Sequence, residues 1–369
     1  MRIISLSQAQ PGMVIARNVF GADGDLLLAG GMILTESYIR RLRSLGIYSI
    51  YIESLLGENV ETPEVLQEKT RTMAVARIQE TFKNLRKRQS TSCEAVHKIA
   101  ATIVEEIMNN KCAMVQLTDI RTFDDYTFGH SVNVCVLAVL TGMALGTMNR
   151  ERLEKLAMGA LLHDVGKMMV PNEIINKPGK LDAGEWKIMQ QHSAYGFEIL
   201  RTKSRDLSII SAHVAFQHHE KFNGEGYPRG LSGDHIHEFA RIVAVADVYD
   251  ALTSDRVYNK AMQLQQAYEI LLAEANTHFD PVILQAFLER IAIYPAGCLV
   301  ELNTGDIGIV VKVIPKLATR PTVRLIVNCD GDRYPDRPEI DLSVEHTIFV
   351  RRVLAEAELS EWNTDITSQ

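Results

Sequence analysis

Cysteines are few in this 369-residue sequence, and long apolar runs are missing. The five cysteines are scattered, without metal-finger spacing or a disulfide framework, so we expect free thiols in a reducing cytoplasm. Residues 1–5 lack the apolar core of a secretory signal peptide. The most apolar stretch, 132–148, is short for a membrane span and is interrupted by Asn133, Thr141 and Gly142. We therefore expect a buried helix there and no membrane span.

An excess of positive charge is also missing. The formal net charge of -7 argues against binding of a nucleic acid polymer, which requires a basic surface. It does not exclude a small anionic nucleotide, because metal ions, lysine and arginine dominate the field inside a site. The hydrophobic content of 46% and the charged content of 23% are ordinary for a globular protein. The length suits two or three domains.

A histidine, an acid and a lysine follow one another closely at the end of an apolar run. On a helix, His163 and Lys167 would share a face, with Asp164 beside them. An imidazole can bind a metal ion, a carboxylate can bridge two ions, and an ammonium group can bind a phosphate oxygen. Suitable partners occur elsewhere in the sequence, at His130, His192, His218, His219 and Asp247. This set of imidazoles and carboxylates suits iron, manganese, nickel or zinc.

The segment from about residue 118 to about residue 294 closely resembles the HD-GYP family of bacterial metal-dependent phosphodiesterases. Several motifs occur in the family's order and with matching gaps, which is far more specific than one short motif. They are 126–131 (YTFGHS), 162–167 (LHDVGK), 176–181 (NKPGKL), 218–220 (HHE), 223–228 (NGEGYP) and 245–256 (VADVYDALTSDR). The resemblance implies a mainly α fold with an HD-type helical bundle that binds two or three metal ions and hydrolyses cyclic di-GMP.

The resemblance also implies roles for individual residues. Its metal ligands would be His130, His163, Asp164, His192, His218, His219 and Asp247. Asp164 would bridge the ions, and the residues near the substrate phosphates and bases would be Lys167, Tyr227, Asp250 and Arg256. Three-metal members carry a glutamate four residues before the first histidine, where Tyr126 stands here. We therefore expect two divalent ions, iron or manganese with nickel also suited, although Asp124 and Asp125 leave a third ion open.

The expected activity is hydrolysis of cyclic di-GMP by a metal-bound hydroxide, with Asp164 and Lys167 as catalytic residues. The product would be pGpG, with GMP left open, and the reaction would lower this second messenger in bacterial signalling, as in biofilm formation and motility. Two alternatives remain. One is a catalytically weak cyclic di-GMP receptor, against which the full ligand set argues. The other is an HD-type hydrolase of another nucleotide such as cyclic GMP-AMP, against which the loop Gly226–Tyr227–Pro228 argues. On the substrate side, Asn223 and the sequence 257–260 depart from the family pattern.

The chain divides into five expected regions. Residues 1–60 form a small α+β accessory or regulatory module, and 61–115 form a helical linker or dimerisation segment. Residues 116–295 form the catalytic domain, 296–355 a small β-rich segment, and 356–369 a frayed tail. A homodimer is left open. So is a diguanylate cyclase or other signalling partner that would bind through the Gly-Tyr-Pro loop.

Local signals predict several element boundaries. Thr35 would cap a helix that runs through Ser44, and a break near 89–92 would divide the helical stretch from Pro63 to about residue 110. Helix starts are expected at Asp182, Asp206 and Asp280. A hairpin turn is expected at 21–24, and short strands at 47–52, 298–302, 308–314, 322–327 and 347–350.

Overall fold

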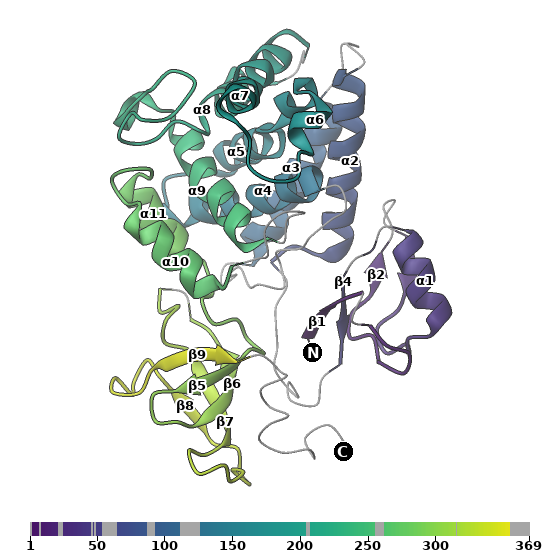
Figure 1. The fold of residues 1–369 in the computed structure, drawn as a ribbon, viewed down its shortest axis with the longest axis vertical. Helices are drawn as coiled ribbons and strands as arrows, with labels where there is room; N and C mark the ends of the chain where they lie inside the picture. The colour runs from purple at the N-terminus through teal and green to yellow at the C-terminus, as the bar shows by residue number, and fades with distance from the viewer. Residues whose placement is uncertain are drawn as a thin grey trace.

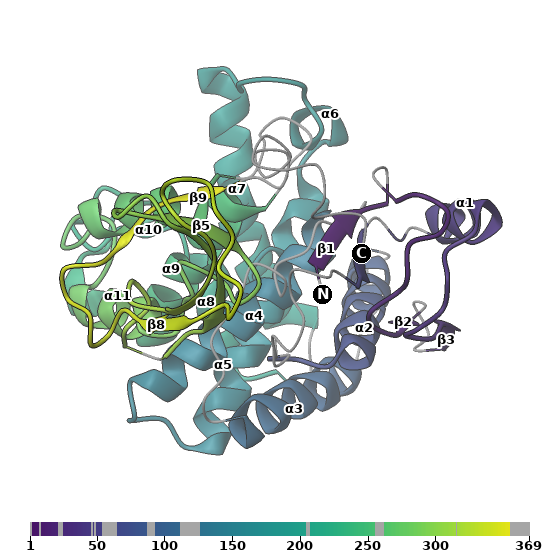
Figure 2. The ribbon, with the colours of Figure 1, turned by 90° about the horizontal axis from the view of Figure 1, so that it is seen from below.

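The computed structural model describes residues 2–6, 9–20, 25–45, 47, 49–53, 65–86, 93–110, 126–203, 207–254, 262–314 and 316–354. The fold is mainly helical, as predicted, with a small α+β module before the helical bundle and an antiparallel sheet after it. Figures 1 and 2 show both small modules at the lower end of the bundle, the first beside helix α2 and the second beneath helix α10.

The N-terminal module contains two small antiparallel pairs and one helix. Strand β1 (Arg2–Ser5) pairs with β4 (Ser49–Ile52), and β2 (Val19–Phe20) pairs with β3 (Leu26–Leu28). Helix α1 (Glu36–Ser44) begins after Thr35, whose side chain accepts a hydrogen bond from the backbone N–H of Tyr38, so the predicted cap is confirmed. The predicted hairpin turn at 21–24 lies outside the described residues.

Helices make up the body of the molecule. In order along the chain they are α2 (Glu68–Arg86), α3 (Glu94–Asn109), α4 (Tyr126–Ala144), α5 (Arg150–Leu162), η3 (Val165–Met169), α6 (Asn172–Ile175), α7 (Ala183–Lys203), α8 (Ile209–Gln217), η4 (Gly233–His235), α9 (Glu238–Thr253), α10 (Leu264–Ala273) and α11 (Pro281–Leu288). Side chains of α2 and α3, the expected linker segment, belong to the same buried cluster as those of α4, α5 and α9. The helical core therefore extends upstream of the region expected to be catalytic.

Helix α4 lies at the centre of this core. Its residues from Val132 to Leu140 are buried on every side, which confirms the buried helix predicted from the apolar run. Its hydroxyl at Thr141 bonds the carbonyl of Leu137, so this buried polar group is satisfied within the helix. Among the described helices, none combines the length and the apolar character needed to cross a membrane.

Helix starts near the site were partly predictable. Asp182 accepts from the backbone N–H of Glu185 while the Glu185 carboxylate accepts from that of Asp182, so the predicted capping box is confirmed. Asp280 caps α11 ahead of Pro281, also as predicted. Helix α8 instead begins after Ser208, and the expected start at Asp206 lies outside the described residues.

The C-terminal module is a five-stranded antiparallel sheet in the order β8-β7-β6-β5-β9. Its strands are β5 (Leu299–Leu302), β6 (Ile307–Lys312), β7 (Thr322–Val327), β8 (Glu339–Asp341) and β9 (Val350–Leu354). The predicted strand at 347–350 was misplaced, because the strand begins where that range ends. Strand β8 was missed, since three residues are too few to show an alternating pattern.

Candidate metal centre

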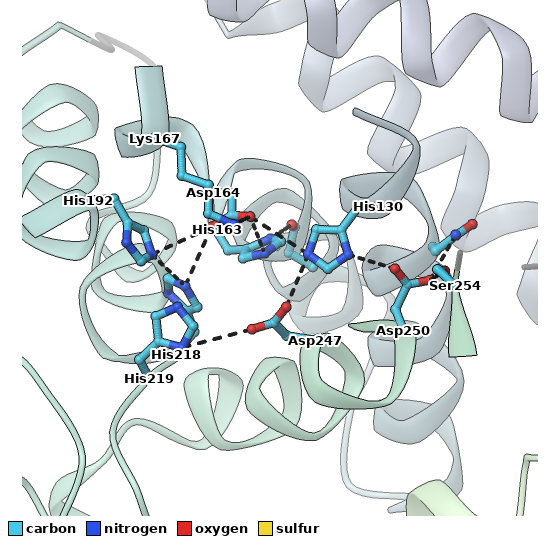
Figure 3. A network of polar contacts seen from close by, with 12 residues as sticks. His130, His163, Asp164, Lys167, His192, His218, His219, Asp247, Asp250 and Ser254 are labelled. Carbon is cyan, nitrogen blue, oxygen red and sulfur yellow. Dashed lines mark hydrogen bonds and ion pairs between the residues drawn. The ribbon is translucent and has the colours of Figure 1, made fainter. Parts of the chain in front are cut away.

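Seven side chains from separate helices and their ends meet inside the bundle. His130 comes from α4, His192 from α7 and Asp247 from α9, and the adjacent pairs His163–Asp164 and His218–His219 directly follow α5 and α8. Ligand atoms of these residues form overlapping groups whose members lie within 4.8 Å of one another. Figure 3 shows the imidazoles and carboxylates turned toward a common centre. The structure thus brings together all seven residues expected to bind metal.

Three of the histidines are oriented in the same way by their own helices. The Nδ1 of His163 lies 2.7 Å from the carbonyl oxygen of Ala160, and that of His192 lies 2.7 Å from that of Met189. The Nδ1 of His218 lies 3.0 Å from the carbonyl of Ala215. A carbonyl only accepts, so each Nδ1 carries the proton and each Nε2 presents a lone pair to the centre.

The Nε2 lone pairs have no hydrogen-bond donor among the described residues of the centre, so they are available to bind a cation. The Nε2 atoms of His192 and His218 face each other at 3.4 Å, although with both Nδ1 atoms protonated neither Nε2 can donate. Buried atoms without a hydrogen-bond partner include His163 Nε2 and Asp164 Oδ1. Burial lowers the pKa of His192 and takes that of His218 well below its ordinary value. Both rings are therefore uncharged at neutral pH and can give a lone pair to a metal ion. The residues present therefore fit divalent metal ions.

The carboxylate of Asp164 divides its two oxygens between two pairs of histidines. Its Oδ1 lies 3.6 Å from His192 Nε2 and 3.8 Å from His218 Nε2. Its Oδ2 lies 3.4 Å from His163 Nε2 and 3.7 Å from His130 Nε2. Burial would raise the pKa of Asp164, but the neighbouring ammonium group of Lys167, together with the adjacent His163 imidazole, holds it well below the ordinary value. An ionised carboxylate placed in this way can bridge two cations.

Asp247 spans the other side of the centre. Its Oδ1 lies 3.1 Å from His130 Nε2, and its Oδ2 lies 3.9 Å from His219 Nδ1. Burial disfavours the charged form of His130, but hydrogen bonds to Asp247 and Asp250 raise its pKa to about 9. Without metal, a proton on His130 Nε2 therefore faces the Asp247 carboxylate.

Asp250 has a different environment from the one that the family resemblance implied. It was expected near the substrate, but its Oδ2 lies 2.7 Å from His130 Nδ1, the ring nitrogen opposite the one that faces Asp164. Its Oδ1 accepts hydrogen bonds from Asn133 and Ser254, and its side chain is completely buried. This carboxylate orients the His130 imidazole, and its buried side chain offers no surface to a substrate.

Lys167 and Tyr227 line the accessible side of the centre. Lys167 Nζ lies 2.5 Å from Asp164 Oδ2 and is partly exposed. The ring of Tyr227 stacks on His219 with a centroid distance of 4.8 Å. The ring of Trp186, whose role was not predicted, meets that of Tyr227 edge-on at 6.3 Å and is 48% exposed. The remaining expected substrate residue, Arg256, lies outside the described residues.

Two further residues shape the site through the backbone. Gly166 lies so close to α7 that a built Cβ would be 1.9 Å from the carbonyl oxygen of His192, so only glycine lets η3 approach this helix. Glu220 is buried and accepts hydrogen bonds from the backbone N–H groups of Arg229 (2.8 Å) and Leu231 (2.9 Å). It thereby holds the glycine-rich loop, residues 223–233, in place.

Comparison with known proteins agrees with this arrangement. Residues 102–283 match the HD domain, and residues 299–361 match the KOW domain associated with HD domains. The cyclic di-GMP phosphodiesterase PA4108 of Pseudomonas aeruginosa is 30% identical over 357 residues, which cover 88% of this chain and 85% of that protein. The 3'3'-cGAMP-specific phosphodiesterase 3 of Vibrio cholerae is 41% identical over 170 residues, 46% of this chain and 36% of its own length.

A solved structure shares the fold. Bd1817, an HD-GYP-type protein from Bdellovibrio bacteriovorus, superposes with a TM-score of 0.53 at 19% identity, covering 78% of this chain and 97% of that one. The long match to the Pseudomonas protein, together with the HD-domain match, defines the class. The chain belongs to the HD-GYP family of HD-domain phosphodiesterases.

Proposed function

We propose that this chain hydrolyses cyclic di-GMP to pGpG at a centre of two divalent transition-metal ions. The observation that carries the proposal is the Asp164 carboxylate, which offers one oxygen to His192 and His218 and the other to His130 and His163. The choice of substrate is supported by the Pseudomonas cyclic di-GMP phosphodiesterase, which resembles the chain along most of its length.

The two ions would be held by His130, His163, Asp164, His192, His218, His219 and Asp247, and iron or manganese suits these ligands, with nickel as a third choice. When bound, such a pair activates water as a nucleophile and stabilises the charge that develops on a phosphoryl group. The chain's own contribution is to fix the imidazole orientations and to keep the Asp164 and Asp247 carboxylates ionised.

The accessible residues act on the substrate. The partly exposed ammonium group of Lys167 can turn from Asp164 to a non-bridging phosphoryl oxygen and neutralise its growing charge. The ring of Tyr227, already stacked on His219, offers a face on which a guanine base can stack. Arg256 stays a predicted phosphate contact, and Asp250 acts on His130.

The test is a turnover assay on chain purified with and without oxygen, with metal quantitation on both samples. We expect two ions per chain and conversion of cyclic di-GMP to pGpG, resolved from GMP by chromatography. Asp164→Asn is the inactive control. Two bound ions with no product from any cyclic dinucleotide would overturn catalysis and favour the receptor alternative.

A second candidate substrate is 3'3'-cGAMP, because several relatives specific for this dinucleotide match the catalytic region, one at 41% identity. Both substrates should be compared in one assay by kcat/KM. A higher value for cyclic di-GMP supports the proposal, and a higher value for 3'3'-cGAMP overturns the substrate choice while leaving the metal centre intact.

Regulation and location follow as further parts of the proposal. Pro228 and Arg229 of the glycine-rich loop are exposed, which suits contact with a signalling protein, and dimer formation stays a prediction. The free thiols among the described cysteines suit a cytoplasmic protein.

A further inference from the structure

A buried chain of hydrogen bonds leads from His130 to helix α2. Asp250 Oδ2 lies 2.7 Å from His130 Nδ1, and Asp250 Oδ1 accepts from the side-chain amide of Asn133 at 2.9 Å. Asn133 Oδ1 in turn accepts from the guanidinium of Arg71 at 2.6 Å. All four side chains are at most 2% exposed. Arg71 lies in the first turn of α2, upstream of the HD-domain match at 102–283.

The direction of this chain is fixed by chemistry. A guanidinium group only donates and a carboxylate only accepts, so Asn133 must turn its oxygen to Arg71 and its NH2 to Asp250. The carboxylate must likewise accept from His130, which places that ring's proton on Nδ1 and frees Nε2 for a metal ion. The amide orientation, and with it the hydrogen bond that Asn133 gives to Asp250, thus depends on a donor at position 71.

Charge gives Arg71 a second influence. A histidine that binds metal through Nε2 is a neutral ligand, so it does not neutralise the buried carboxylate of Asp250. The guanidinium of Arg71 then faces that carboxylate across a single amide. A buried carboxylate is stable only when hydrogen bonds and a nearby cation compensate for its lost hydration.

We propose that Arg71 is a positioning residue of the metal centre. Acting through Asn133 and Asp250, it fixes the orientation of the His130 ring. It thereby sets the affinity for the ion that His130 would bind together with His163. The inference rests on the proposed two-metal function. Helix α2 contacts both β2 of the N-terminal module and η3, which carries Lys167. A shift of this helix would therefore reach the metal centre through Arg71.

The test is calorimetric titration of metal-free, full-length chain with Mn²⁺ alone. We expect two binding steps for the unmodified chain. Arg71→Met should weaken one step by about tenfold or more and leave the other unchanged, because an outer-shell partner of one ligand is lost. Arg77→Met is the matched control, since Arg77 lies on the same helix in a surface pair with Glu80. It should change neither step.

Two further variants separate positioning from general stability. Arg71→Gln keeps an N–H donor for Asn133 and should recover part of the lost affinity. Adding Arg71→Met to Asp250→Asn should weaken metal binding no further than Asp250→Asn alone, because both changes interrupt the same series of hydrogen bonds. Additive losses, equal weakening of both steps, or no change in Arg71→Met would overturn the proposal.

If Arg71→Met does not fold, Asn133→Ser gives the same comparison. It interrupts the series of hydrogen bonds one residue nearer to His130 and leaves the guanidinium in place. Fewer than two steps in the unmodified chain would count against the two-metal centre. The Arg71→Met and Arg77→Met variants are then compared on the one binding step that remains. If Arg71→Met binds Mn²⁺ as tightly as the unmodified protein does, the positioning role is overturned.

Discussion

Replacing Asp164 with asparagine removes a buried negative charge while keeping the shape of the side chain. The two oxygens of this carboxylate face different histidine pairs, His192 with His218 and His163 with His130, so one substitution should weaken both ions. An amide offers one neutral oxygen in place of two charged ones. We expect each ion to lose at least about a hundredfold in affinity, more than an outer-shell change produces.

The effect on thermal stability follows from linkage. At a Mn²⁺ concentration of about a hundred times its Kd, each ion stabilises the folded chain by about 2.7 kcal/mol. A hundredfold loss of affinity is also worth about 2.7 kcal/mol, so at the same concentration the variant should lose nearly all of this stabilisation. For two ions the missing shift in Tm is on the order of 10 °C. Lys167 loses its ion partner but is partly exposed, so water can solvate its ammonium group.

The assay is thermal unfolding with and without Mn²⁺, combined with metal analysis after gel filtration. Asp280→Asn is the matched control, because Asp280 is also buried but caps α11 and pairs with Arg241 at 2.7 Å. Asparagine is also a good helix cap, so this control should keep its metal-dependent shift. An Asp164→Asn protein that retains both ions would refute the bridging role. Loss of a single ion would assign Asp164 to one site only.

Three other perturbations have defined outcomes. Lys167→Met should keep both metals and lower kcat by about a hundredfold, and an unchanged kcat would remove this residue from catalysis. Gly166→Ala should lower Tm and metal content, because the new Cβ would lie 1.9 Å from the His192 carbonyl, whereas Gly184→Ala meets only a flexible side chain at 3.2 Å. Mn²⁺ must displace a proton from His130, whose pKa is raised to about 9, so its apparent affinity should fall about tenfold per pH unit below that value. Since this folded-state pKa lies above the unfolded value of about 6.5, the same group stabilises metal-free chain fully below about pH 6.5, and that contribution is lost as the pH rises through about 9. A pH-independent Mn²⁺ titration would contradict this protonation.

The clustering of the seven candidate metal ligands was predictable because their types and order match the motifs of the HD-GYP family. Helix caps such as Thr35 and Asp280 were predictable for a local reason, since each satisfies backbone N–H groups within three residues. Asp250, which lies three residues after Asp247 on the same helix, was assigned to the substrate by the family resemblance. Both in fact contact His130, one at each ring nitrogen. Spacing places two carboxylates near one another but does not tell which ring nitrogen each will meet.

The residues that sequence reasoning missed act across long separations. Arg71 and Asn133 are 62 positions apart, and Asn133 and Asp250 are 117 apart. Buried hydrogen bonds of this kind carry no periodic signal, and a lone asparagine inside an apolar run looks only like an interruption. Trp186 was missed for a different reason: one exposed aromatic residue on a helix has no pattern until Tyr227 is placed beside it.

The centre holds donor atoms in an arrangement that the metal-free chain alone would not favour. Two imidazole nitrogens that cannot donate face each other at 3.4 Å, and buried atoms such as Asp164 Oδ1 lack a partner. Each such buried group destabilises the metal-free fold by roughly 1–3 kcal/mol. The surrounding apolar packing of α4, α5 and α9 must offset this, which explains why so polar a centre lies inside the largest hydrophobic cluster. Metal binding therefore relieves unfavourable contacts that folding has already imposed, and affinity for the ions is coupled to the stability of the whole bundle.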